Sequence, residues 1–208
     1  MGAREEVTLS DGSRVTLNTS TRGRAIVNEK ERRFWLEEGE VYFEIAHDST
    51  RPFVVQAGRD RVTVLGTKFS VRHEHGRSEI TVIEGRVQLD SDGGGPASKP
   101  VVMTRNESAV ATAGNVLVIA KNEQAVRDEL SWRVGRLVFD QMTLADVAAR
   151  FNRYNGTQLV ITGAAAERRF SGSFDATNVE GFARLLHESF GLEVHRDGKS
   201  TLVVADRP

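Results

Sequence analysis

The chain has 208 residues, of which 39% are hydrophobic and 27% are charged, a composition typical of a soluble globular protein long enough for two domains. Its 28 Lys and Arg nearly balance its 29 Asp and Glu, so the net charge of -1 provides no general attraction for nucleic acid or anionic lipid. The 0 Cys exclude a disulfide framework, thiol nucleophiles and cysteine-rich zinc sites. No apolar run approaches the roughly 20 residues that span a bilayer.

The first part of the chain, residues 5–121, alternates apolar and polar residues with a period of two, as in Val41, Phe43 and Ile45. Such alternation places apolar side chains on one face of a strand and predicts an all-β domain. A glycine turn followed by an alternating strand recurs, with equal separations from Gly12 to Gly39 and from Gly58 to Gly85. This loose repeat predicts a solenoid-like or stacked-hairpin arrangement.

Two segments interrupt this pattern. The stretch from Asp90 to Pro100 is rich in Gly, Pro and Ser, which predicts a surface loop between strands. No glutamate follows Asp90 and Asp92 at the spacing that a calcium loop requires. The polar residues 122–131 predict a short helical or irregular connector between two domains.

The second part, residues 132–206, alternates strands and helices and predicts a small α+β (βαβ-βαβ) sandwich domain with helices on one face of a sheet. Thr143 followed by Asp146 predicts the start of the first helix, and Asn155-Gly156 predicts its end. Thr177 with Glu180 predicts the start of the second helix, which Gly191 ends.

Catalytic and metal-binding patterns are weak. His73 and His75 are two residues apart, so on a strand they would share a face as metal ligands do. Their charged and glycine neighbours favour an exposed strand end instead. Ser10, Ser70 and Ser171 lie in no nucleophile-elbow context. We therefore expect neither an enzyme nor a cofactor or metal site.

Several phrases in chain order resemble known families. In the first part they are DGSRVTLN, LEEGEVYFEI, RPFVVQA, VLGTKFSVR and VIEGRVQL, which resemble the FecR family of anti-sigma regulators. In the second part, Trp132–Gly156 followed by Arg168–Asn178 resembles the short N-terminal domain of secretins and TonB-dependent receptors. Together these resemblances cover nearly the whole chain.

The resemblance implies a function in cell-surface signalling. It implies that the chain is the periplasmic part of a single-pass inner-membrane protein that regulates iron or siderophore uptake. Its partners would be the signalling domain of a TonB-dependent outer-membrane transporter and, through a cytoplasmic part, an extracytoplasmic-function sigma factor. No nucleic acid is implied as a partner, and the fragment itself is expected to be monomeric.

A small sheet has edges whose free N–H and C=O groups can accept a partner's strand, which makes the strand at residues 169–174 a candidate docking site. The predicted partner-binding residues are Arg168, Arg169, Phe170, Ser171, Ser173 and Phe174. Two alternatives stay open: a carbohydrate or cell-wall binding β module, and a secretin-like assembly subunit. Trp35 and Trp132 adjoin apolar runs and are predicted to lie in a core or at a domain junction rather than to bind ligand.

Overall fold

The computed structural model describes residues 4–91, 100–113 and 115–206. The chain divides after Val126 into two compact units, a division that falls inside the expected connector 122–131.

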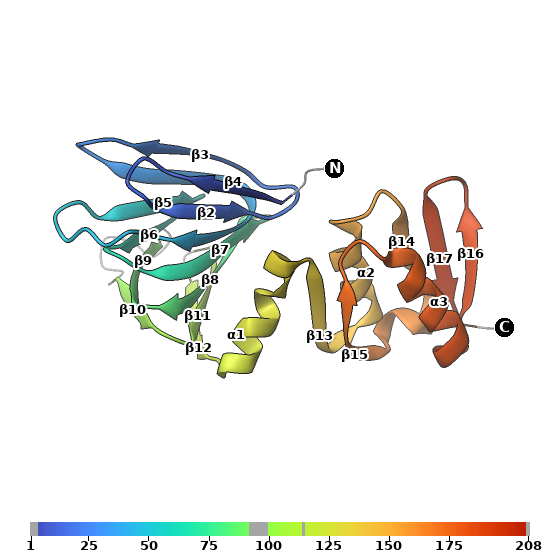
Figure 1. Ribbon diagram of the computed structural model, residues 1–208. Helices are drawn as coiled ribbons and strands as arrows, with labels where there is room; N and C mark the ends of the chain where they lie inside the picture. The colour runs from blue at the N-terminus through green and yellow to red at the C-terminus, as the bar shows by residue number, and fades with distance from the viewer. Residues whose placement is uncertain (1–3, 92–99, 114, 207–208) are drawn as a thin grey trace. The chain divides into compact units, whose positions relative to one another are not determined.

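The first unit is a twelve-stranded β-sheet with the order β10-β9-β6-β5-β4-β7-β8-β11-β12, to which β1, β2 and β3 attach through β2 and β4 (Figure 1). The strands are β1 Glu5–Thr8, β2 Arg14–Leu17, β3 Arg22–Val27, β4 Arg32–Glu44, β5 Phe53–Ala57, β6 Asp60–Val64, β7 Lys68–Glu74, β8 Arg77–Glu84, β9 Arg86–Ser91, β10 Val101–Thr104, β11 Glu107–Thr112 and β12 Asn115–Ala120. The predicted β-rich character of this region is confirmed.

Strand β4 is the centre of this unit. Its first part pairs with β3 and β5, and its second part pairs with β2 and β7. Gly39 lies between these parts with a φ of 104°. A Cβ atom on Gly39 would lie 2.6 Å from the Cα of Thr21, so only glycine fits this close approach.

The core of the first unit comes from the alternate residues that the sequence pattern marks as apolar. Phe43 and Phe69 stack with ring centroids 4.9 Å apart, and Phe34 meets Phe43 edge to face at 5.2 Å. These three rings lie among branched aliphatic side chains from β5 to β9.

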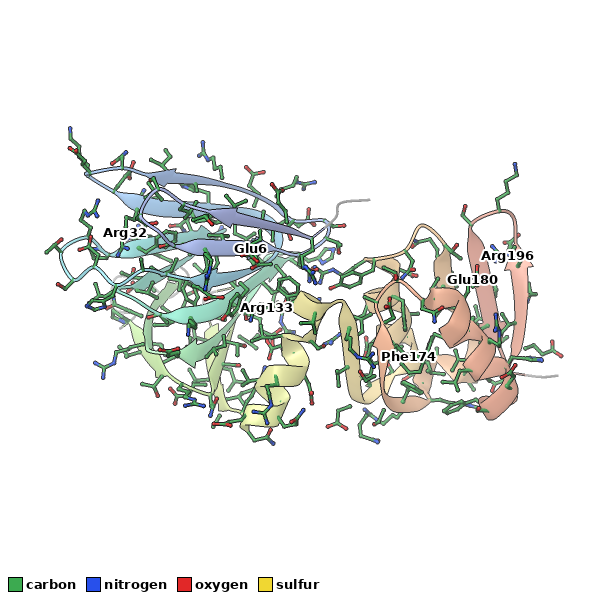
Figure 2. The ribbon with its side chains drawn as sticks, in the orientation of Figure 1. Glu6, Arg32, Arg133, Phe174, Glu180 and Arg196 are labelled. Carbon is green, nitrogen blue, oxygen red and sulfur yellow. The ribbon has the colours of Figure 1, made fainter. Side chains whose placement is uncertain are left out.

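Arg32 is the largest charged side chain buried in this unit, at 1% exposure (Figure 2). Its guanidinium donates to the carbonyl oxygens of Arg51 at 2.7 Å and Ala46 at 2.8 Å. It also forms an ion pair with Asp11 at 3.2 Å. Arg32 therefore ties the β1–β2 turn and the segment after β4 to the start of β4.

The solenoid alternative is wrong. Stacked coils require parallel ladders between successive turns, whereas in this unit only β4 and β5 pair in parallel among the strands described. The equally spaced glycines also occupy different positions, because Gly12 lies in the turn between β1 and β2 whereas Gly39 lies inside β4. Hairpins, rather than repeated coils, account for the alternation.

The second unit contains two small sheets. One pairs β13 with β15, and the other has the order β14-β17-β16. The elements are α1 Glu123–Glu129, which crosses the division between the units, the 3₁₀ turn η1 Ser131–Val134, β13 Arg136–Thr143, α2 Leu144–Asn152, β14 Gln158–Ile161, η2 Gly163–Glu167, β15 Arg169–Asp175, α3 Val179–Phe190, β16 Glu193–Asp197 and β17 Thr201–Ala205. The expected single sheet with helices on one face is therefore wrong, because α2 packs against strands of both sheets.

A cluster of phenylalanine rings fills the second core. Phe182 of α3 stacks on Phe151 of α2 at 4.8 Å and meets Phe170 and Phe174 of β15 edge to face at 5.2 Å. On the far side of α3, Glu180 forms an ion pair with Arg196 of β16 (Figure 2). Buried apolar residues of α2, α3 and both sheets form one core.

The helix ends test the local sequence predictions. Thr143 caps α2 as expected, since its Oγ1 accepts from the N–H of Asp146. Gly191 ends α3 with a φ of 68°, also as expected. The predicted cap at Thr177 is wrong, because Asn178 caps α3.

Asn155 does not end α2, which stops at Asn152. Its side-chain amide is buried and donates at 2.8 Å to the carbonyl oxygens of Phe151 and Ala176. It therefore links the end of α2 to the segment before α3.

Most of the loop expected between Asp90 and Pro100 lies outside the described residues, and β9 runs to Ser91. Among the residues that the structure describes, no helix combines the length and hydrophobicity needed to cross a membrane.

Candidate functional site: the open edge of β15

Strand β15 carries most of the predicted partner-binding residues. Among the described strands it pairs only with β13, so one of its two edges has no neighbouring strand. An edge of this kind presents backbone donors and acceptors that a partner strand can use.

Two hydrogen bonds determine which backbone groups face this open edge. The N–H of Ala176 donates to the carbonyl of Gly135 at 2.9 Å, and the N–H of Leu144 donates to the carbonyl of Arg168 at 2.8 Å. Because hydrogen-bonded pairs alternate along an antiparallel ladder, every second residue between these ends points away from β13. Among the predicted partner-binding residues, those that point outward are Arg169, Ser171 and Ser173.

Ser171 lies at the middle of the edge, opposite an irregularity in β13. The register shifts between Phe139 and Met142, and Gln141 has a φ of 49°. The backbone N–H and the side-chain amide of Gln141 donate to the Ser171 Oγ at 2.9 and 3.0 Å. The Ser171 hydroxyl thus holds the bulge, while its backbone N–H and C=O face outward.

Ser173 is the second outward position, and Arg136 of β13 lies against it. The Arg136 guanidinium donates to the Ser173 Oγ at 2.8 Å and to the Ser173 carbonyl at 3.1 Å. A partner strand would therefore compete with Arg136 for this carbonyl, whereas at Ser171 the side-chain bonds come from Gln141 and involve only the hydroxyl.

The two arginines before the strand have different environments. Arg168 forms an ion pair with Asp206 at 2.6 Å and is thereby tied to the end of the described chain. Arg169 donates to the carbonyl of Gln141 and lies on the exposed face of the sheet. Of this pair, Arg169 is the better placed to meet a partner.

The two phenylalanines of the predicted site contribute mainly to the core. Phe170 is 5% exposed, and Phe174 of β15 is half-buried against Phe182 (Figure 2). The surface that β15 offers is therefore its polar face and outward backbone groups.

Asp175 closes the strand. The hydroxyl of Thr177, at 2.6 Å, and then its backbone N–H, at 2.8 Å, hold the pKa of the Asp175 carboxyl below its ordinary value. This turn fixes the C-terminal end of the open edge.

The candidate metal pair at His73 and His75 is not assembled. His73 lies in β7 with its Nδ1 2.9 Å from the Ser78 Oγ, and His75 lies in the following turn with a φ of 50°. The two rings therefore do not share a strand face. Within the described residues, no group of three or more acidic, His or Cys side chains is arranged to hold a metal ion.

A solvent-open depression on the first unit is lined by charged residues that pair with one another. Arg14 meets Glu44 at 2.7 Å, and Lys68 meets Glu84 at 2.7 Å. Register places these four residues side by side on β2, β4, β7 and β8. This mutual pairing makes the depression a weaker candidate site than the β15 edge.

Trp35 has an arrangement that the sequence did not reveal. The guanidinium carbons of Arg24 and Arg33 lie 4.6 and 5.4 Å from its ring centroid. Trp35 is half-buried, whereas Trp132 is 4% exposed, so the indole of Trp132 is not a surface platform for a ligand. Because two arginines already lie over the Trp35 ring, the ring is a poor platform for stacking a sugar.

Comparison with known proteins identifies the first unit. Residues 1–88 match the model of the FecR protein family. This region belongs to the FecR family. The FecR match covers the strands from β1 to β8 and the start of β9. Among curated proteins, none matches the chain.

Two solved structures share the fold of the whole chain. Both are crystal structures, at 1.65 and 2.50 Å resolution, of a proposed anti-sigma factor from Parabacteroides distasonis ATCC 8503. Each superposes with a TM-score of 0.79 over 100% of this chain and 96% of the other, at 24% and 23% sequence identity.

Proposed function

We propose that this chain is the periplasmic signalling module of a transmembrane anti-sigma regulator. In this proposal the module binds the signalling domain of a TonB-dependent transporter and relays the signal to an extracytoplasmic-function sigma factor. The membrane span and the sigma-binding segment would belong to parts of the protein beyond these residues. The observation that carries the proposal is the FecR match over residues 1–88.

The β15 edge is the proposed docking site. Its outward backbone groups at Ser171 provide hydrogen-bonding positions for an added strand, and Arg169 provides a positive charge on the same surface. Main-chain bonds would supply most of the affinity, and the charge would steer an acidic partner. Phe170 and Arg168 act within the unit rather than in the docking surface.

The direct test is calorimetric titration of the fragment with isolated signalling domains from several candidate transporters. We expect one domain to bind with a measurable heat at micromolar concentrations. If none of the domains binds, the proposed partner is wrong.

A pair of variants at Ser171 then tests the surface. Ser171→Pro removes the outward N–H together with the hydroxyl, whereas Ser171→Ala removes the hydroxyl alone and is the matched control. We expect the proline variant to lose about fivefold in affinity, because one lost hydrogen bond is worth about 1 kcal/mol. The alanine variant keeps the outward N–H and should bind within about twofold of the parent. Circular dichroism verifies that both are folded, and equal binding by both would place the docking surface elsewhere.

A further inference from the structure

The last strand of the large sheet, β12, has an unusual exposed edge. Among the described strands it pairs only with β11, so its other edge is open. Its sequence, NVLVIA, contains no charged residue. Leu117, Ile119 and Val118 are 62%, 45% and 38% exposed, so apolar side chains face water on both sides of the strand.

Other outer strands of this unit are protected. β1 carries Glu5 and Glu6, and β3 carries Arg22 and Arg24. Charges on edge strands prevent unwanted pairing with other chains. β10 begins directly after Pro100, which cannot donate a ladder hydrogen bond. β12 has no such protection along its length.

The phase of the β11–β12 ladder shows which backbone groups are available. The N–H of Lys121 donates to the carbonyl of Asn106 at 2.7 Å, which makes this a hydrogen-bonded pair. By alternation, the N–H and C=O groups of Val116, Val118 and Ala120 point away from β11. These three outward residues, at alternate positions along the strand, can form a regular ladder with another strand.

We propose that β12 pairs antiparallel with β12 of a second copy of this chain, about a two-fold axis at Val118. In this register Val118 faces its own copy, Val116 faces Ala120, and Leu117 faces Ile119. Each outward residue then exchanges hydrogen bonds with another outward residue. An isologous contact of this type closes as a dimer and does not propagate.

The composition of β12 supports a second copy as the occupant. Every cross-strand pair in the central register joins two apolar side chains, and the terminal pair joins Asn115 with Lys121. Like charges facing each other are the usual obstacle to pairing between identical strands, and in this register no like charges meet. The contact involves one strand from each copy, so we expect a weak, concentration-dependent dimer rather than the monomer expected from sequence.

The test is sedimentation velocity over a series of protein concentrations. The parent should shift from monomer to dimer as concentration rises. Val118→Lys places two like charges at the two-fold axis, and it should remain monomeric over the same range. Val102→Lys is the matched control, because Val102 is a 54% exposed valine on β10, and this variant should dimerise as the parent does.

Circular dichroism and thermal melting establish that both lysine variants are folded. A parent that stays monomeric at every concentration overturns the proposal. So does equal behaviour of the two lysine variants.

The register is tested separately, using the fact that the chain has 0 Cys. Val118→Cys introduces a single thiol that should be joined to its copy by a short bifunctional thiol reagent, whereas Val102→Cys should not be. If the protein dimerises but Val118→Cys is not joined, the dimer uses another surface and the β12 proposal is wrong. The inference does not depend on the proposed transporter partner, because β12 and β15 belong to different units.

Discussion

The two open edges, β12 and β15, differ in what their side chains present. On β15 the outward positions include Arg169, Ser171 and Ser173, and the phenylalanines Phe170 and Phe174 pack in or against the core. On β12 the apolar residues are exposed on both faces. A polar edge suits a partner that separates again after binding, whereas an uncharged apolar edge favours a partner of like composition.

The properties of an open edge therefore depend on the side chains of the adjacent strand as well as on the sequence of the edge strand itself. Arg136 and Gln141 of β13 bond to the two serines of β15 and keep that edge ordered and polar. Among the strands that the structure describes, β12 pairs with β11 alone, on its inner side. The two edges should therefore respond to different substitutions.

The largest expected effect comes from destabilising the second unit, which carries β15, while the first unit, which carries β12, is left unchanged. Phe182→Ala removes the ring at the centre of the second core, where it contacts Phe151, Phe170 and Phe174. We expect the free energy of unfolding of this unit to fall by about 3–5 kcal/mol. Urea denaturation measures the loss, and binding at β15 should weaken while the β12 dimer persists. Loss of the dimer in this variant would show that the edges are not independent.

The converse substitution acts on the first unit. Arg32→Met removes the ion pair to Asp11 and the bonds to the carbonyls of Arg51 and Ala46. We expect a loss of about 3 kcal/mol, because the remaining partners are left buried without their cation. In calorimetric melting, the transition of the first unit should move to a lower temperature. The β12 dimer should weaken, whereas binding at β15 should be retained. A conservative control, Arg33→Met, alters an exposed neighbour and should change the melting temperature little.

The smallest effect is a pH dependence confined to the β15 end. The pKa of Asp175 is lowered in the folded state, so its carboxylate contributes stability above the unfolded pKa of about 3.9. This contribution is lost as the pH falls through the lower, folded-state pKa. As the pH is lowered from neutral to acidic, the melting temperature of Asp175→Asn should fall less steeply than that of the parent. The same slope in both proteins would contradict the assigned role of Asp175.

Sequence reasoning succeeded where the signal was local. The alternation around Phe43 predicted strands, and Thr143 with Asp146 predicted a helix start, because both depend on residues a few positions apart. It failed at Thr177 because its neighbour Asn178 is equally able to cap, and Thr177 bonds to Asp175 instead. Two adjacent candidates of this kind cannot be ranked from sequence alone.

Features that depend on distant pairing were beyond the sequence. Alternation states which face of a strand is buried but not which strands are neighbours, so it could not divide the second unit into two sheets. The open edge of β12 was missed for the same reason. The guanidinium groups over Trp35 also depend on the β3–β4 register, which places Arg24 opposite Trp35.

The shared position of β4 has a consequence for the order of folding. Four strands pair with it, two from the preceding chain and two from the chain that follows. During synthesis β2 and β3 emerge before their partner β4. β3 can complete its pairing once residue 38 has appeared, whereas β2 can complete its pairing with β4 only once residue 44 has appeared. Contacts between distant strands form slowly. β4 is therefore the segment on which the large sheet assembles, and delays in translation before it would prolong exposure of the early strands.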